Sequence, residues 1–491
     1  MGVGFNTGTF LSEEIGQSFS FGVSVAAHTG IGTLPILYYG TDAQKAKYLP
    51  GLANGQIKAA YCLTEPGSGS DALSAKTKAT LTEDGEHYII EGQKMWITNS
   101  GFADMFIVFA QIDGNKFTGF IIDKGAENLN LGAEEEKLGI KGSSTRQVFL
   151  EGVKIPKENI LGEIGKGHKI AFNVLNIGRF KLGAMVMGGS KAGCTTSIKY
   201  ANERIQFGVP IASFGAIQHK LAEQAIQIYA CESATYRTSG LIEKKVEEYA
   251  IECAIIKVVG SEVLHYVVDE TVQVHGGNGF SEEFDAARAY RDARINKIFE
   301  GTNEINRLLS VGMLIKKGMK GQLDIMTPAM AIQKELMSVP SFNGNGATGV
   351  LSAELKAIQS AKKAFLMVAG SAVQKFMQDL EKQQEIIMLA ADVLMDIFTA
   401  ESTILRTQKL VSIKGEEASS VQIDATVVFV SDALERIFLN GKRAVCGFAE
   451  GDELKMMMMG IKRFTKFAPV NTIAARKRVA ESLIAANEYN L

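Results

Sequence analysis

Cysteine and histidine are scarce in this chain of 491 residues, and neither sign of charge is in large excess. Its five cysteines (62, 194, 231, 253 and 446) are scattered without a Cys-x-x-Cys pair, and its six histidines show no ligand spacing such as His-x-x-x-His. We therefore expect neither a disulfide framework nor a metal site, and we predict that the cysteines are reduced, buried, small apolar residues. The net charge of -2 lacks the basic excess of a nucleic-acid-binding protein, which argues against that class of partner.

Long apolar runs are also missing. No run approaches the roughly 20 residues that a bilayer-crossing helix needs, and the N-terminus lacks the basic-then-apolar order of a signal peptide. The chain opens into small and apolar residues at 23–32, which are typical of the interior of a helical domain. We therefore expect the true start to lie upstream. The balance of 46% hydrophobic and 22% charged residues is that of a globular protein with about three domains.

Changes in residue pattern divide the first two thirds of the chain. Up to residue 57 the pattern is helical, and Thr41-Asp42 before an Ala/Lys/Gln run predicts a helix start. Short β-branched or aromatic runs then alternate with turns such as Asp84-Gly85 and Asp113-Gly114, which predicts an antiparallel β domain. The runs are 87–92, 95–98, 105–110, 117–123 and 146–150. Long apolar-periodic segments follow at 168–202, 216–240, 245–275 and 284–317, which predicts a helical bundle.

The last third has its own pattern. A stretch rich in Pro, Gly, Ser and Asn, centred on 338–352, predicts a linker. Beyond it, Ile387, Ala390, Ala391, Leu394 and Phe398 fall on one face of a helix. We predict a multidomain α+β fold in five segments: an incomplete N-terminal helical domain (1–57), a middle β domain (58–165), a helical bundle (166–320), a linker (321–352) and a C-terminal helical extension (353–491).

Glu300 is the most informative candidate for chemistry. It follows the apolar pair Ile298-Phe299 and precedes Gly301. Poor solvation raises the basicity of a carboxylate, and a glycine lets a substrate come close, so this setting suits a general base. A Glu-Gly pair taken alone is more often a surface carboxylate at a helix end. Both interpretations stay open until other motifs are considered.

Two further segments suit a cofactor. Residues 61–71 supply hydroxyls and free backbone N–H groups in a glycine-permitted turn, which suits a planar heterocycle and a phosphate, although a polar loop held by Asx and Ser turns has the same composition. Because no Gly-x-Gly-x-x-Gly pattern lies there between a strand and a helix, a Rossmann domain is not supported. Residues 95–99 hold the only tryptophan, Trp96, which is usually a core residue but beside Thr98 can flank a redox ring.

Six motifs taken together resemble the acyl-CoA dehydrogenase family, in the family's order and over nearly all of residues 5–317. They are 61–71, 96–99, 178–179, 204–208, 273–279 and 299–307. The C-terminal extension is similar to that of the very-long-chain branch. The resemblance implies an FAD-dependent enzyme that converts a long or very long acyl-CoA thioester to trans-2-enoyl-CoA and passes electrons to electron-transferring flavoprotein.

The resemblance also implies roles for single residues. Glu300 would be the catalytic base, since other branches place the base where this chain has Gly178, which has no side chain to serve. The flavin contacts would be Tyr61, Leu63, Thr64, Gly69, Ser70, Trp96, Ile97, Thr98, Thr302 and Glu304. A neighbouring subunit would add Arg204, Phe207, Gln273, Val274, His275, Gly276 and Gly277. The substrate contacts would be Ser70, Asn176, Arg179, Phe299 and Gly301, and the small residues Val23 and Ala27 would leave a deep acyl tunnel.

The same resemblance implies partners and leaves alternatives. The extension covers the surface that unextended relatives use to pair dimers into tetramers, so we expect a homodimer. The protein would be located in the cytoplasm of a bacterium or on the matrix side of a mitochondrion.

Met456 to Met459 with Lys462 and Arg463 form either a peripheral membrane contact or a core filler with a solvated basic edge. An acyl-CoA oxidase and a non-catalytic assembly or scaffold protein are the alternative functions. The family's first helices are absent, which we interpret as truncation.

Overall fold

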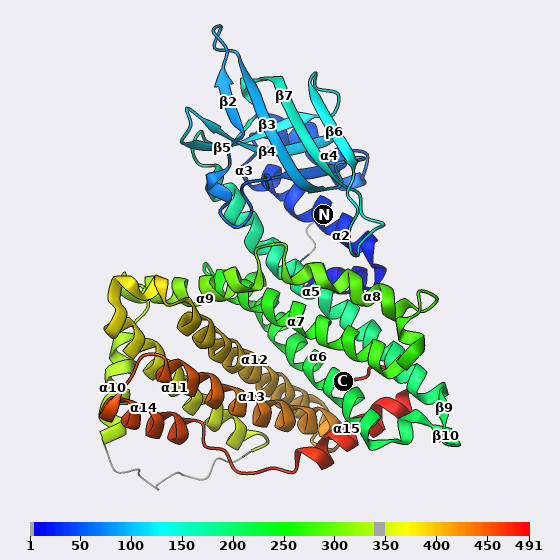
Figure 1. Cartoon of the computed structure of the whole chain (residues 1–491), viewed down its shortest axis with the longest axis vertical. Helices are drawn as coiled ribbons and strands as arrows, with labels where there is room; N and C mark the ends of the chain where they lie inside the picture. Colours follow the sequence, from blue (N-terminus) through cyan, green and yellow to red (C-terminus); the bar gives the residue numbers. More distant parts are fainter. Residues whose placement is uncertain (1–3, 338–348) are drawn as a thin grey trace. The chain divides into compact units, whose positions relative to one another are not determined.

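The structure is a computed structural model that describes residues 4–337 and 349–491. Its contacts divide the chain into two units. The β unit comprises Leu11–Met185 and Arg291–Thr302, and the helical unit comprises the chain up to Phe10, Val186–Tyr290 and Asn303–Leu491. Figure 1 shows the elements in chain order.

The β unit is built on one eight-stranded sheet in the order β6-β7-β3-β2-β4-β5-β8, with β1 paired to β4. The strands are β1 (Ala59–Cys62), β2 (Lys78–Leu81), β3 (His87–Thr98), β4 (Met105–Ile112), β5 (Lys116–Asp123), β6 (Leu129–Glu134), β7 (Thr145–Pro156) and β8 (Ile160–Leu161). Most neighbouring strands are antiparallel, as predicted, but β1 and β2 each pair with β4 in parallel. The prediction of a purely antiparallel sheet was wrong at these two strands. All four residues of β1 are buried, so the strand lacks the alternation typical of a half-exposed antiparallel strand.

Helices of the N-terminal segment contribute to the same unit. They are α1 (Phe5–Ile15), which begins in the helical unit, α2 (Ser20–Ala26), a π-helical turn η2 (Ala27–Gly32), α3 (Leu34–Tyr39) and α4 (Asp42–Asn54). The predicted start of α4 is confirmed. Thr41 Oγ1 accepts the Gln44 backbone N–H at 3.2 Å, and the Gln44 side chain accepts the Thr41 N–H at 3.0 Å, so the two residues form a capping box.

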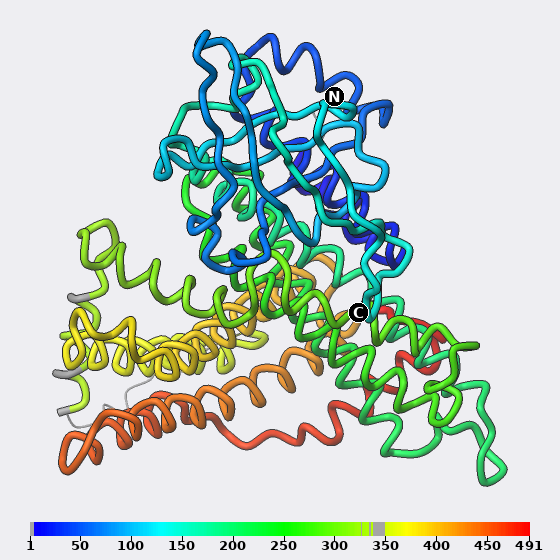
Figure 2. Tube along the Cα trace, turned by 45° about the horizontal axis from the view of Figure 1, so that its top comes forward, coloured from blue at the N-terminus to red at the C-terminus, as the bar shows by residue number. Residues whose placement is uncertain are grey.

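The helical unit contains the bundle and the extension. Its helices are α6 (Gly215–Glu243), α7 (Ala250–His275), α9 (Asn303–Met319), α10 (Met326–Met337), α11 (Ser352–Phe376), α12 (Gln384–Lys414), α13 (Ser420–Cys446), α14 (Gly451–Phe464) and α15 (Thr472–Ala486). A two-stranded hairpin, β9 (Ile205–Gln206) and β10 (Val209–Pro210), precedes α6. Two more helices, α5 (Gly167–Glu203) and α8 (Asp285–Ala293), run through a unit boundary. In Figures 1 and 2 the last helix, drawn in red, returns to lie against the green helices, and α15 does contact α6.

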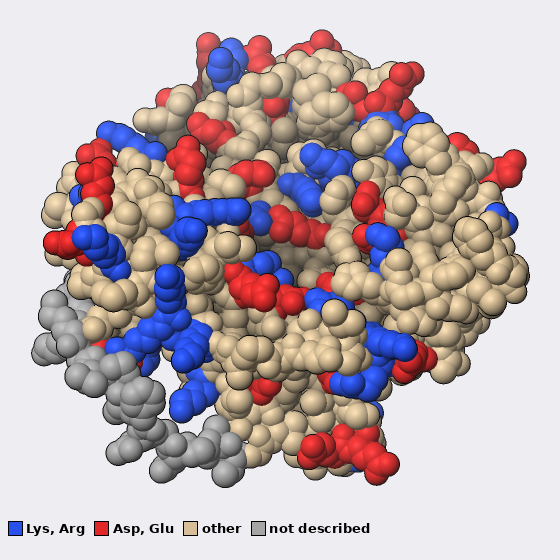
Figure 3. Space-filling view, turned by 60° about the horizontal axis from the view of Figure 1, so that its bottom comes forward, with Lys and Arg blue, Asp and Glu red and all other residues tan. Residues whose placement is uncertain are grey.

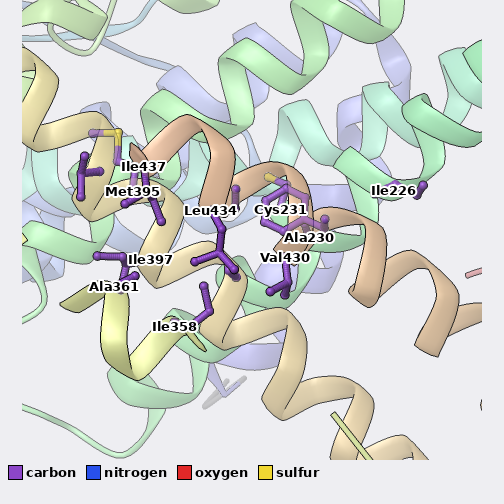
Figure 4. Packing of buried hydrophobic residues seen from close by; sticks show 14 of the residues in the cluster. Ile226, Ala230, Cys231, Ile358, Ala361, Met395, Ile397, Val430, Leu434 and Ile437 are labelled. Carbon is purple, nitrogen blue, oxygen red and sulfur yellow. The ribbon is translucent and has the colours of Figure 1, made fainter. Parts of the chain in front are cut away.

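One apolar core joins the extension to the bundle. Figure 4 shows side chains from α6, α11, α12 and α13 packed together. They include Ile226, Ala230, Ile358, Ala361, Met395, Ile397, Val430 and Leu434, all of which are buried. The predicted apolar face of α12 is confirmed, because Ile387, Ala390 and Ala391 are buried in this core and Leu394 and Phe398 pack against it. The five-segment division of the sequence stays a prediction.

Several local predictions need correction. The helix α10 lies inside the segment predicted as a linker, and part of the predicted loop, 338–348, is outside the described residues. The predicted helix 284–317 is two helices, α8 and α9, with an irregular stretch between them. Four cysteines are buried, but Cys446 is exposed at the end of α13. In α14, Met457 is buried and Met459 is exposed, so part of the methionine run fills the core.

Length and composition would allow two helical segments, Ser20–Tyr39 and Gly167–Glu203, to cross a membrane. In the second segment, 72% of the most apolar window is buried within the fold, as in a core helix of a soluble protein, so this test is weak evidence for a membrane span. On the face drawn in Figure 3, acidic and basic side chains both occur over most of the surface, and a group of basic side chains lies at the lower left.

A partly buried ionic network ties the extension to the bundle. Arg307 on α9 contacts Glu262 of α7 at 2.8 Å and Asp392 of α12 at 2.6 Å. These residues line a cavity of about 420 Å³, where Asp396 and Arg436 form a second ion pair at 2.7 Å. The charges of this cavity are therefore matched by partners within the chain.

We expect Arg307→Met to destabilise the helical unit. The substitution leaves two partly buried carboxylates without their cation, a change that typically costs about 3–5 kcal/mol. The melting temperature should fall by several degrees. Arg478→Met is the matched control, because the Arg478 guanidinium pairs with Asp424 while largely exposed to solvent, where ion pairs contribute little. Equal melting temperatures for the two variants would contradict the structural role of Arg307.

Candidate active site

The predicted base lies on an irregular loop between two helices. After a short 3-10 turn (Arg294–Lys297), Glu300 has a φ of 59° and Gly301 has a φ of 79°, and α9 begins at Asn303. A left-handed backbone costs a residue with a side chain about 1–2 kcal/mol, while glycine adopts it freely. A strained glutamate held by its surroundings is the kind of outlier that marks functional sites. The alternative of an ordinary surface carboxylate at a helix end is not supported, because Glu300 is partly buried.

The Glu300 carboxylate lies against Gly178 of α5. A Cβ atom placed on Gly178 would stand 2.8 Å from Glu300 Oε2 and 3.4 Å from the Ile31 side chain. Glycine at 178 therefore makes room for the carboxylate. Ile31 belongs to the π-helical turn η2, so an N-terminal segment supplies an apolar wall beside the base.

Arg179 supports the backbone of the base. Its guanidinium Nε donates to the Glu300 carbonyl oxygen at 3.2 Å, and Nη1 donates to Asn176 Oδ1 at 2.9 Å. Arg179 is only 7% exposed. The predicted substrate residues Asn176 and Arg179 are thus brought to the base loop. Their contact with a substrate stays a prediction.

Tyr61 of the first motif lies near the predicted base. Its side chain is buried with its ring edge-on to Phe109, at 5.3 Å between centroids. Burial, followed by the nearby Glu300 carboxylate and the Cys62 thiol, raises the pKa of the Tyr61 phenol well above its usual value of 10.0. Among residues 4–337 and 349–491, nothing hydrogen-bonds the Tyr61 hydroxyl. A buried hydroxyl that stays protonated and has no hydrogen-bond partner among the described residues is suited to form a hydrogen bond with a ligand.

Trp96 lies on a β-bulge. The register between β3 and β7 shifts between Lys94 and Ile97, and Trp96 at this shift has a φ of 60°. The bulge turns the side chain outward, where it is 52% exposed, so the expectation of a core tryptophan does not hold. The Met95 N–H donates to the Thr64 carbonyl oxygen at 2.9 Å. The two motifs that sequence analysis proposed as a cofactor site therefore lie side by side.

Substitutions at Trp96 should show the backbone strain. We expect Trp96→Gly to be more stable than Trp96→Ala by about 1 kcal/mol, since only glycine adopts this φ without a steric cost. Thermal or urea unfolding measures the difference. At the exposed Lys154 on the neighbouring β7, where no such φ occurs, the order should reverse, with alanine more stable than glycine. The same order at both positions would contradict the bulge geometry.

The remaining members of the first motif differ in exposure. Gly69 and Ser70 are open to solvent, and nothing lies within 4 Å of a Cβ atom placed on Gly69. Leu63 is buried. In the motif that holds Trp96, Ile97 is buried at the end of β3, and Thr98 pairs with Thr145 of β7. Phe299 and Thr302 flank the base on its loop, and both are partly buried.

The residues predicted to serve a neighbouring subunit belong to the helical unit. Arg204 and Phe207 lie at the β9–β10 hairpin, where Phe207 has a φ of 53° and is 94% exposed. Gln273, Val274 and His275 end α7, and Gly276 and Gly277 follow with Gly276 at a φ of 60°. Tyr200, just before the hairpin, stacks on His275 at 4.0 Å and donates its hydroxyl to the His275 carbonyl oxygen. Because Tyr200 lies near the end of α5, these contacts join the end of α5 to the end of α7. Glu304 is exposed in the first turn of α9.

Sequence analysis missed two charged residues at this site, Lys94 and Glu65. Both are buried and form an ion pair at 2.7 Å. A signal was available for the lysine, because Tyr88, Ile90 and Lys94 share the inward-facing phase of β3. A charge at an inward position of a strand predicts a buried partner.

Comparison with known proteins identifies the family. Acyl-CoA dehydrogenase domain models match along the chain: the N-terminal domain over 1–56, the middle domain over 60–153 and two models of the C-terminal domain over 165–313 and 360–463. A probable acyl-CoA dehydrogenase of Bacillus subtilis is 46% identical over 500 residues, which cover 98% of this chain and 84% of that protein. The chain belongs to the acyl-CoA dehydrogenase family. It is therefore an enzyme of the flavin-dependent oxidoreductase class, as the six motifs predicted.

Other members of the acyl-CoA dehydrogenase family match in part or in full. The human mitochondrial very long-chain specific enzyme is 44% identical over 308 residues, which cover 61% of this chain and 47% of that protein. The crystal structure of an acyl-CoA dehydrogenase complexed with FAD from Bacillus anthracis is 45% identical, with a TM-score of 0.96 over 100% of this chain and 86% of the other. The predicted α+β fold is confirmed by this match.

Proposed function

We propose that this protein removes the α-proton of a long or very long acyl-CoA with Glu300 and releases trans-2-enoyl-CoA. The observation that carries the proposal is the Glu300 carboxylate, held on a left-handed loop against Gly178 and near the buried Tyr61 hydroxyl. The cofactor is FAD, as in the similar protein from Bacillus anthracis. The residues present fit that cofactor, since an unmatched buried hydroxyl, an exposed indole and an open glycine turn lie on joined segments.

Each residue of the site has its own role in the proposed reaction. Glu300 takes the proton from the carbon next to the thioester carbonyl, and negative charge then develops on the carbonyl oxygen. In this proposal the backbone N–H of Glu300 stabilises that oxygen, and Arg179 holds the same peptide segment through the Glu300 carbonyl oxygen. When bound, the flavin supplies the acceptor for the hydride that leaves the β-carbon. Trp96 shields the reacting atoms from water, and Ile31 keeps the base poorly solvated.

Several finer properties belong to the same proposal. Small residues at Val23 and Ala27, on α2 and η2, leave space for a long acyl chain. Similarity to very long-chain specific enzymes supports this preference, although a short-chain specific enzyme of Megasphaera elsdenii is also 39% identical over 298 residues. We propose electron-transferring flavoprotein as the acceptor and the cytoplasm or the mitochondrial matrix side as the location. The solvated edge of α14 is the place for a peripheral membrane contact.

A homodimer is the expected assembly. Phe207 is almost fully exposed on a hairpin, and an aromatic side chain in that state is typical of a surface that a partner covers. Arg204 beside it would bring a positive charge to a phosphate of the neighbour's FAD. Light scattering that gives a monomer or a tetramer would contradict this assembly.

A substrate series under anaerobic conditions tests the function. Acyl-CoA thioesters from butyryl to very long chains are added to the flavin-replete protein, and flavin absorbance is followed. We expect bleaching that is fastest with long chains. No bleaching with any saturated acyl-CoA would reject the proposal, and stoichiometric peroxide release in air would indicate an oxidase. A purified protein that does not bind added FAD would favour an assembly role.

A further inference from the structure

A buried ion pair joins the first motif to the tryptophan bulge. Lys94 of β3 has no exposed surface, and Glu65 is 7% exposed. Lys94 Nζ donates to Glu65 Oε1 at 2.7 Å and to the Leu63 carbonyl oxygen at 3.4 Å. The lysine therefore contacts two residues of the 61–71 turn from a position two residues before Trp96.

The Glu65 carboxylate also accepts hydrogen bonds from a third segment. Its carboxylate accepts the Lys76 N–H at 2.6 Å, the Thr77 N–H at 3.1 Å and the Thr77 hydroxyl at 2.5 Å. A Cβ atom on Gly92 of β3 would stand 2.8 Å from Thr77 Cα, so a glycine is what lets β3 approach this segment. The carboxylate thus connects the turn, the residues before β2 and strand β3.

The protonation of the pair follows from these contacts. Burial raises the pKa of Glu65, but Lys94 and the donors from Thr77 and Lys76 outweigh burial, so the pKa is lowered and the carboxylate stays ionised at neutral pH. Burial lowers the pKa of Lys94, and Glu65 offsets only part of that effect.

Stability alone does not explain a charged pair at this place. Removing two charges from water costs several kcal/mol for each ion, and apolar side chains of similar volume are often as stable or more stable. A buried pair with directional hydrogen bonds does fix the relative position of the segments that it joins, which apolar contacts do less strictly.

The segments joined are those that face the cofactor in the proposed function. The Thr64 carbonyl oxygen accepts the Met95 N–H, and Glu65 and Ser68 exchange two backbone hydrogen bonds of 2.9 and 3.1 Å. The shape of the turn and the place of the bulge are therefore set by one connected network. We infer that Lys94 and Glu65 are positioning residues that hold the 63–71 turn and the Trp96 bulge in the geometry that FAD binding requires. This inference rests on the proposed function, since it concerns the same site.

The test compares FAD affinity with the stability of the FAD-free protein. In Lys94→Met/Glu65→Gln the charges are removed at nearly constant volume. We expect its FAD-free melting temperature to stay within a few degrees of that of the wild type. Its FAD dissociation constant, measured by flavin fluorescence, should rise at least tenfold, and the visible flavin spectrum should change shape. An unchanged dissociation constant and spectrum would overturn the inference.

Conservative variants of the two residues, and a control variant at a different ion pair, complete the experiment. Lys94→Arg and Glu65→Asp keep the charges but move them, so they should weaken FAD binding even if the neutral variant fails to fold. If both bind FAD as tightly as the wild type does, the inference is wrong. Arg436→Met breaks an ion pair to the partly buried Asp396 in the extension, so it should lower the melting temperature without changing FAD affinity. Failure of the proposed function looks different, because the wild-type protein itself would then not bind FAD or not bleach with acyl-CoA.

Discussion

In Glu300→Gln, the rate of flavin reduction by acyl-CoA should fall by about 10²–10⁴-fold, the range in which general bases contribute. The amide has nearly the same shape as the carboxylate but cannot accept the α-proton. FAD should still bind, because the backbone of the loop and its contact with Arg179 do not involve the exchanged atoms. Anaerobic stopped-flow absorbance of the flavin measures the rate.

Glu163→Gln is the matched control for this prediction. Glu163 is an exposed carboxylate on the loop before α5, so the same chemical change there should leave the rate within a factor of two. A Glu300→Gln variant that bleaches as fast as the control would mean that another group takes the proton.

Moving the base to α5 should restore activity. Because the Cβ position of Gly178 stands 2.8 Å from Glu300 Oε2, a carboxylate carried by residue 178 has access to the same space. We expect Gly178→Glu/Glu300→Gly to reduce the flavin at least 10-fold faster than Glu300→Gly alone, by the lower limit of the effect of a general base. A glycine at 300 also removes the strain of the left-handed backbone.

Two variants test whether a carboxylate at position 178 restores activity by acting as the base, and not by restoring the fold. Glu300→Gly with Gly178→Gln fills the same space without a base and should stay inactive. Gly178→Ala alone should slow reduction, because the new methyl group would displace the Glu300 carboxylate. If the glutamine and glutamate versions were equally active, position 178 would not face the reacting carbon.

Short-range patterns were predicted well from the sequence. Thr41 and Gln44 cap α4 as predicted, since the capping box depends only on residues three apart. Asp113 and Gly114 form the turn between β4 and β5 with positive φ angles of 52° and 76°, as their composition indicated. Motif order was enough to identify the family and to select Glu300, because the spacing of many motifs together is specific even when each motif is weak.

Long-range features could not be predicted in this way. No local pattern indicates that β1 and β2 pair with β4 in parallel, and the insertion of one residue in β3 at Trp96 reverses which side chains face outward. The close approach of Gly178 to the Glu300 carboxylate joins residues far apart in the chain, and no local pattern shows it. These features depend on which segments meet after the chain has closed into a sheet and a bundle.

The sequence by itself determined the family and the class of chemistry and selected Glu300 as the candidate base, because these depend on residue types at fixed local spacing. Only the tertiary structure decided how the base is held. It placed the carboxylate in the space left by Gly178, brought Arg179 to its backbone, and joined Lys94 to Glu65 between the 61–71 motif and strand β3. The physical reason is that burial and hydrogen-bond partners are set by segments distant in the chain.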